Sequence, residues 1–111
     1  MLTQAAVERE LMRLLEASED NAHQLAEIAE IAARAEHDYK VGHAKALLRA
    51  DGAVAVREAQ ALLAVEELHL ARKIADARLM AAQEAGRQIR SSMDALRSVN
   101  ASVRHAAGDG W

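Results

Sequence analysis

The chain has 111 residues, enough for one domain, and contains no Cys, Pro or Phe. Without Cys it cannot form a disulfide, so nothing in the sequence indicates an oxidising compartment. The net charge is −3, but residues 1–38 are strongly acidic, whereas residues 87–111 are basic. Ala, Leu, Glu, Arg and Gln dominate, and all are good helix formers. The composition therefore predicts an all-α protein with thin, Ala-lined helix contacts.

The first predicted helix covers residues 3–50. Thr3 is its candidate N-cap, but it is a weak one because Ala6 stands where a capping box has Glu. One side of the helix is apolar, at Leu25, Ile28, Ala29, Ala32, Ala35, Tyr39, Gly42, Ala46 and Leu47. Residues 17–23 leave two interpretations open. Either Ser18 caps a new helix, or one helix runs through.

Asp51-Gly52 is the strongest turn signal, because Gly adopts a positive φ without a Cβ clash. After this turn, apolar residues recur at alternating spacings of four and three, which predicts one helix over residues 54–106 with a heptad seam. The main seam candidates, for the hairpin or for an oligomer, are Leu68, Leu79, Ile89, Met93 and Leu96.

Two helices of similar length around one turn predict a long antiparallel, coiled-coil-like helical hairpin. It would form a single domain over residues 1–107, followed by a flexible tail at 108–111. Such pairing would join the acidic and basic halves, through Arg78–Glu27, Lys73–Glu30 and Arg97–Glu8. An Ala-rich seam buries too little apolar surface to offset the conformational entropy that the chain loses on folding. We therefore expect a homo-oligomer, most simply a dimer that forms a four-helix bundle.

Residues 35–52 contain the most varied chemistry of the chain. The five His are scattered, without the i, i+3 or i+4 pairing of helical metal sites, so no metal ligand and no cofactor are predicted. Tyr39 and His43 form a candidate hydrogen-bonded pair at i, i+4, with simple packing as the alternative. The sequence has no Gly-rich phosphate loop and no nucleophile elbow. No catalytic residue and no enzyme activity are therefore predicted.

Two groups of basic residues are candidate binding surfaces. The group near the turn is a candidate partner-binding surface and consists of Lys40, Lys45, Arg49 and Arg57. A stripe farther along is a candidate nucleic-acid contact, because phosphates need rows of cations, and consists of Arg87, Arg90, Arg97 and Arg104. Pairing of this stripe with the acidic N-terminal half is the alternative interpretation. The negative net charge and the scarcity of aromatic residues for base stacking favour that alternative.

The chain also carries a recognisable pattern around the turn, Tyr39…Ala44-Lys45-Ala46…Leu48…Gly52…Arg57-Glu58-Ala59…Ala61, followed by DALRSVNA near the end of the long helix. This pattern resembles small helical proteins, functionally uncharacterised, that actinobacterial phages and prophages encode. The resemblance covers about residues 30–103. It implies a phage setting, near replication or recombination genes, and it carries over no catalytic residue.

These features predict a non-enzymatic, phage-type protein-interaction module that acts on a phage or host protein. One alternative is an accessory nucleic-acid-binding protein in phage replication or recombination. Another is a structural or assembly protein, such as a scaffold or chaperone. The sequence contains no membrane span, and its start lacks the features of a signal peptide, so we expect a cytoplasmic location, in the host cell if a phage encodes it.

Overall fold

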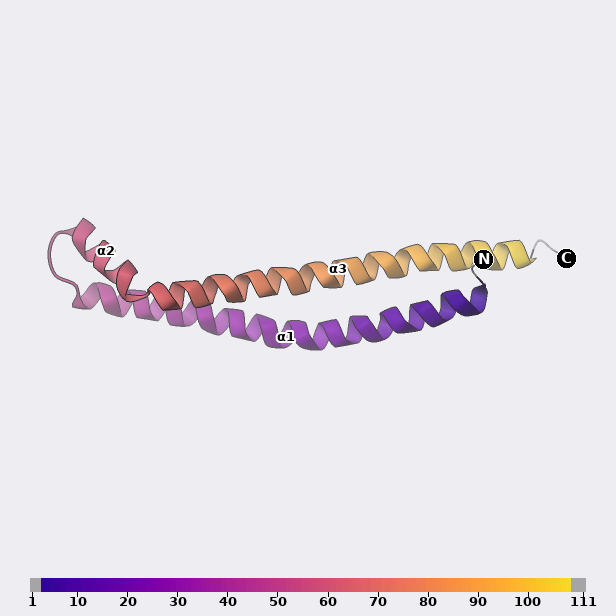
Figure 1. Cartoon of the computed structure of the whole chain (residues 1–111), viewed down its shortest axis with the longest axis horizontal. Helices are drawn as coiled ribbons and strands as arrows, with labels where there is room; N and C mark the ends of the chain where they lie inside the picture. Colours follow the sequence, from indigo (N-terminus) through magenta and orange to yellow (C-terminus); the bar gives the residue numbers. More distant parts are fainter. Residues whose placement is uncertain (1–2, 109–111) are drawn as a thin grey trace. The chain divides into compact units, whose positions relative to one another are not determined.

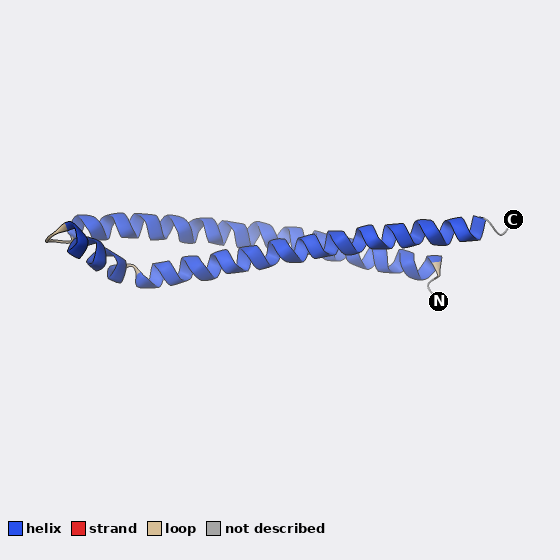
Figure 2. Cartoon of the chain, turned by 90° about the horizontal axis from the view of Figure 1, so that it is seen from above, coloured by secondary structure: helices blue, strands red, loops and turns tan. Residues whose placement is uncertain are grey.

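The chain folds into three helices and no strand over residues 3–108, the part that the computed structural model describes. They are α1 (Gln4–Arg49), α2 (Val54–Ala64) and α3 (Glu66–Gly108) (Figure 1). Figure 2 shows that only short loops interrupt the helices. The predicted all-α helical hairpin is confirmed. The helix α3 includes Gly108, and the remainder of the predicted tail, residues 109–111, lies outside the described residues.

The helices group into two compact units. Unit 1 combines the N-terminal residues up to Leu25 with the residues from Ala82 onward, and unit 2 comprises Ala26–Ala81. Each unit contains a part of α1 and an antiparallel part of α3, and unit 2 also contains the connecting loop and α2. The single domain predicted over residues 1–107 stays a prediction.

The start of α1 is capped as the sequence predicted. The Oγ1 atom of Thr3 accepts a hydrogen bond from the Ala6 N–H (3.1 Å), which satisfies one of the free amides of the first turn. The helix then continues through Ser18 without a break. Residues 17–23 contain no Gly or Pro, and Ser18 is half-buried instead of capping a new helix. Of the two interpretations of this segment, the continuous helix is therefore the one observed.

The hairpin of unit 2 closes at Gly52. Its φ of 107° is positive, and no other described residue has a positive φ. An L side chain at this φ would be strained, which explains why Gly occupies the position. The predicted turn at Asp51-Gly52 is confirmed. The next residue, Ala53, is extended (φ −65°, ψ 156°), and α2 begins after it without a side-chain cap.

The single helix predicted over residues 54–106 is wrong at Val65, which separates α2 from α3. Its φ of −111° and ψ of 19° lie outside the helical range, although its N–H still bonds to the Ala61 carbonyl (3.2 Å). No Gly or Pro causes this interruption. The Val65 side chain is buried against α1 at Gly42, where a Cβ atom added to the glycine would lie 3.5 Å from Val65 Cγ1 and 2.7 Å from Leu68 Cδ1. The interruption thus coincides with a close approach of the chain to α1 in unit 2.

A line of buried residues, mostly small and apolar, forms the seam between the paired helices of each unit. The buried seam residues of unit 2 are Ala32, Ala61, Val65 and Ala75, and those of unit 1 are Val7, Leu14, Met93 and Asn100. Among the seam candidates from the sequence, Met93 is buried, while Leu68, Leu79, Ile89 and Leu96 are half-buried. Because few large side chains are buried, each seam removes little apolar surface from water.

The register differs from the predicted one. In unit 1, Arg104 rather than Arg97 lies beside Glu8, with an Nη2–Oε1 distance of 3.9 Å. The predicted pairs Arg78–Glu27, Lys73–Glu30 and Arg97–Glu8 do not form. Instead, Glu30 pairs with Arg34 one turn along the same helix (2.8 Å). Partners at i, i+3 or i+4 are already adjacent, so a charged side chain reaches them without any constraint from the opposite helix.

Candidate functional surfaces

The only Tyr of the chain is the centre of a cluster in unit 2. Its ring stacks on the ring of His43, one turn later in α1, with centroids 5.9 Å apart and an interplanar angle of 19°. From α3, the ring of His69 approaches Tyr39 with centroids 5.3 Å apart, and Arg72 Cζ lies 5.0 Å from the Tyr39 centroid. The cluster therefore joins α1 and α3 through a tilted ring contact and a cation–π contact.

This cluster is a packing feature and not a hydrogen-bonded Tyr–His pair. The pair at Tyr39 and His43 matches the packing alternative that the sequence left open. The sequence did not predict the contacts to His69 and Arg72, although Arg72 is a charged residue among the mainly apolar seam positions. Within residues 3–108, no three His, Asp or Glu side chains converge into a group that could hold a metal ion.

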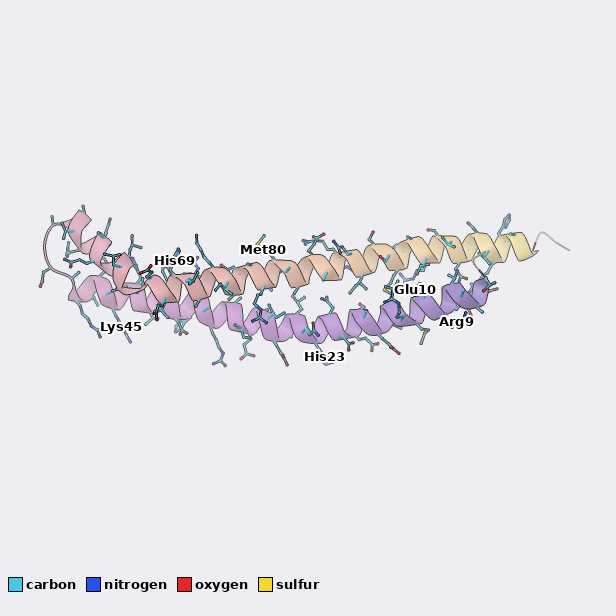
Figure 3. The ribbon with its side chains drawn as sticks, in the orientation of Figure 1. Arg9, Glu10, His23, Lys45, His69 and Met80 are labelled. Atoms are coloured by element: carbon cyan, nitrogen blue, oxygen red, sulfur yellow. The ribbon has the colours of Figure 1, made fainter. Side chains whose placement is uncertain are left out.

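The four basic residues near the turn differ in their surroundings. Lys40 pairs with Glu36 on α1 (3.1 Å), and this hydrogen bond, followed by the charges of Lys40 and Arg72, lowers the pKa of the Glu36 carboxyl below its usual value. Lys45 and Arg49 are exposed on α1, and Lys45 points outward in Figure 3. Arg57 is half-buried on α2, where its Nε has no hydrogen-bond partner among the described residues.

The arginine stripe of unit 1 is mostly paired. Arg87 binds Glu84 (2.7 Å) and Arg97 binds Asp94 (3.2 Å), both within α3, whereas Arg104 reaches Glu8 on α1. Arg90 makes no ion pair with any residue that the structure describes. Neutralisation of the stripe therefore comes mainly from α3 itself, and only Arg104 pairs with the acidic N-terminal half.

A second apolar line runs along α3 in unit 2, and sequence reasoning missed it. Leu70, Ile74, Ala77 and Ala81 are exposed, and their spacing of four, three and four residues places them on one helix face, between the seam positions. Leu70 is 58 % exposed and Ile74 52 %. Met80, next to this line, points away from α1 in Figure 3. These five residues are called the outer stripe below.

The sequence does contain a signal for the outer stripe. Its spacing repeats that of the seam on the opposite side of the same helix. The seam is the longer of the two apolar lines on this helix, so it dominates the pattern and the outer stripe is the weaker signal. Only the observed burial shows which of the two lines α1 covers.

Charged residues beside the outer stripe have no ion-pair partners among the described residues. Glu66 and Glu67 stand in the first turn of α3, where carboxylates are favourable for the helix dipole. Lys73 and Arg78 follow about two and three turns later. All four side chains are exposed. By contrast, most charged side chains of unit 1 have an ion-pair partner.

Comparisons with protein-family models, with curated proteins and with solved structures find no match to this chain. In the part of the chain that the structure describes, no helix is both long enough and apolar enough to cross a membrane.

Proposed function

We propose that this chain is a non-enzymatic protein-interaction module that binds its partner through the outer stripe. One observation carries the proposal: α3 has two apolar faces in unit 2, and α1 covers only one of them. Leu70 and Ile74 on the other face are more than half exposed. A contiguous apolar line on a helix is typical of a surface that binds another helix.

Nucleic-acid binding is the weaker proposal. Three of the four arginines in the stripe stand beside carboxylates, so phosphates would have to displace these partners before counterion release could contribute to binding. The resemblance at residues 30–103 supports a phage or host protein as the partner and the host cytoplasm as the location. A scaffold or assembly role would use the same apolar surface.

Site-specific photo-crosslinking tests the proposed function. A benzophenone-bearing amino acid replaces Ile74 on the outer stripe in one variant and Glu27, exposed on α1 of the same unit, in a control. After irradiation in the producing cells, we expect a protein adduct at position 74 and none at position 27. Equal adducts at both positions, or no protein adduct at position 74, would contradict the proposal.

A further inference from the structure

We infer that the outer stripe binds the outer stripe of a second copy of this chain, with the two α3 helices antiparallel. The inference rests on the proposed function and specifies its partner. It starts from the surface area, because the chain exposes 8251 Å². A compact monomer of its mass, 12.0 kDa, would expose about 6000 Å². This surplus per chain is larger than the roughly 800 Å² that each partner buries in a dimer interface of standard size, so the chain has surface available for one.

The apolar residues fit a two-fold axis that crosses α3 near residue 72. Antiparallel pairing about this point sets Leu70 of one copy beside Ile74 of the other, and the same contact forms a second time by symmetry. The large side chains of Leu70 and Ile74 thus meet at the centre of the stripe, and the small side chains of Ala77 and Ala81 follow towards its C-terminal end, which is compatible with close helix packing.

The charges select the antiparallel orientation. Glu66 and Glu67 lie at the N-terminal end of the stripe, and Arg78 lies towards its C-terminal end. Antiparallel pairing brings Glu67 of one copy to the same flank of the interface as Arg78 of the other, and level with it to within one residue, whereas parallel pairing would set each charge beside its own copy. None of these three side chains has an ion-pair partner among the described residues.

Lys73 meets its own copy near the two-fold axis. It lies at the edge of the outer stripe and is exposed, so its long side chain keeps the ammonium group in water. The like-charge contact at the centre of the interface therefore stays solvated and costs little.

Sedimentation equilibrium of the full chain tests the partner and the surface. We expect a dimer whose dissociation constant rises about 100-fold or more in Ile74→Asp, because each copy would bury a charge. Met12→Asp, at a 59 % exposed apolar residue on α1 of unit 1, should leave the dimer intact, and circular dichroism checks that both variants stay helical. A monomeric wild-type chain, or a dimer that survives Ile74→Asp, would overturn the inference.

Single cysteines test the orientation, since the chain has none of its own. Under mild oxidation, Lys73→Cys should form a disulfide-linked dimer. Ala81→Cys should not, because antiparallel pairing separates the two copies of residue 81 by roughly 27 Å along the axis. Efficient linkage at both positions would show parallel pairing and overturn the antiparallel arrangement.

The two proposals fail in distinguishable ways. If the wild-type chain is monomeric but position 74 crosslinks to a different protein, the self-association inference is wrong and the proposed function holds. If position 74 gives no protein adduct and the chain is monomeric, both are wrong.

Discussion

The two units use the same helix in opposite ways. In unit 2, the side of α3 that faces away from α1 is apolar, with Leu70 and Ile74 more than half exposed. The spacing of the outer stripe continues into unit 1, where it meets mainly polar residues, namely Glu84, Gln88, Ser91, Ala95 and Ser98. One helix is therefore amphipathic in the usual sense over unit 1 and apolar on two sides over unit 2.

The two units also differ in how their charged side chains are paired. In unit 1, ion pairs join Glu10 to Arg13, Glu84 to Arg87, Asp94 to Arg97 and Glu8 to Arg104. In unit 2, the ion pairs of the described residues lie on α1, while Glu66, Glu67, Lys73 and Arg78 of α3 have no such partner. A helix segment with both an uncovered apolar line and unpaired charges has the composition of an interface. A segment whose outer face is polar and whose charges are paired is stable when that face is exposed to solvent.

The largest expected effect comes from a charge in the seam of unit 1. Met93→Asp should destabilise the chain by roughly 3 kcal/mol or more, because a buried thioether is lost and a carboxylate is buried without a partner. In hydrogen exchange, the amides of unit 1 should lose protection first. The control Ser91→Asp, at an exposed position, should keep the protection of the wild-type chain. Equal loss of protection throughout both units would show that the units unfold together, which would remove the contrast between them.

The turn of unit 2 should be the next most sensitive position. Gly52→Ala should cost about 1–2 kcal/mol in the free energy of unfolding, because alanine is strained at the φ of 107°. The adjacent substitution Asp51→Ala, at a residue with negative φ, is the control and should be close to neutral. Chemical denaturation followed by circular dichroism measures both. A neutral Gly52→Ala would mean that the loop adopts another conformation in solution.

Two asparagines of unit 1 offer a smaller and opposite effect. Asn100 is buried, and its Oδ1 has no hydrogen-bond partner among the described residues, so Asn100→Leu should stabilise the chain by about 1 kcal/mol. Asn21 donates a hydrogen bond from Nδ2 to the Ala82 carbonyl (3.2 Å), so Asn21→Leu should not stabilise it. Thermal unfolding of the two variants checks the contrast, and an equal response would contradict the assigned difference in hydrogen bonding.

The smallest effect is on the pH dependence. Hydrogen bonds from Arg13 and Lys40 lower the pKa values of Glu10 in unit 1 and Glu36 in unit 2 below the ordinary value of 4.5. A folded-state pKa below the unfolded one contributes stability above pH 4.5 that is lost as the pH falls through the folded-state pKa. Lys40→Gln should raise the pKa of Glu36 alone, as carboxyl NMR titration would show. A shift of Glu10 as well would mean that the two ion pairs are coupled.

The local features of this protein follow from its composition and residue spacing alone. Helix propensity, the Thr3 cap and the Gly52 turn depend on residues within one or two turns, so composition and spacing predict them. The seam positions could also be predicted, because the four-and-three spacing of apolar residues is a property of one helix.

Which surfaces meet depends on contacts between helices. The register, the interruption at Val65 and the contact of Tyr39 with Arg72 depend on how closely α1 and α3 approach at Gly42 and on side-chain shapes that no single helix contains. Ion pairs within one helix replaced the predicted pairs between helices, because neighbouring partners need no particular register. The outer stripe became a candidate interface for the same reason: spacing marks an apolar line, but only packing shows which line stays uncovered.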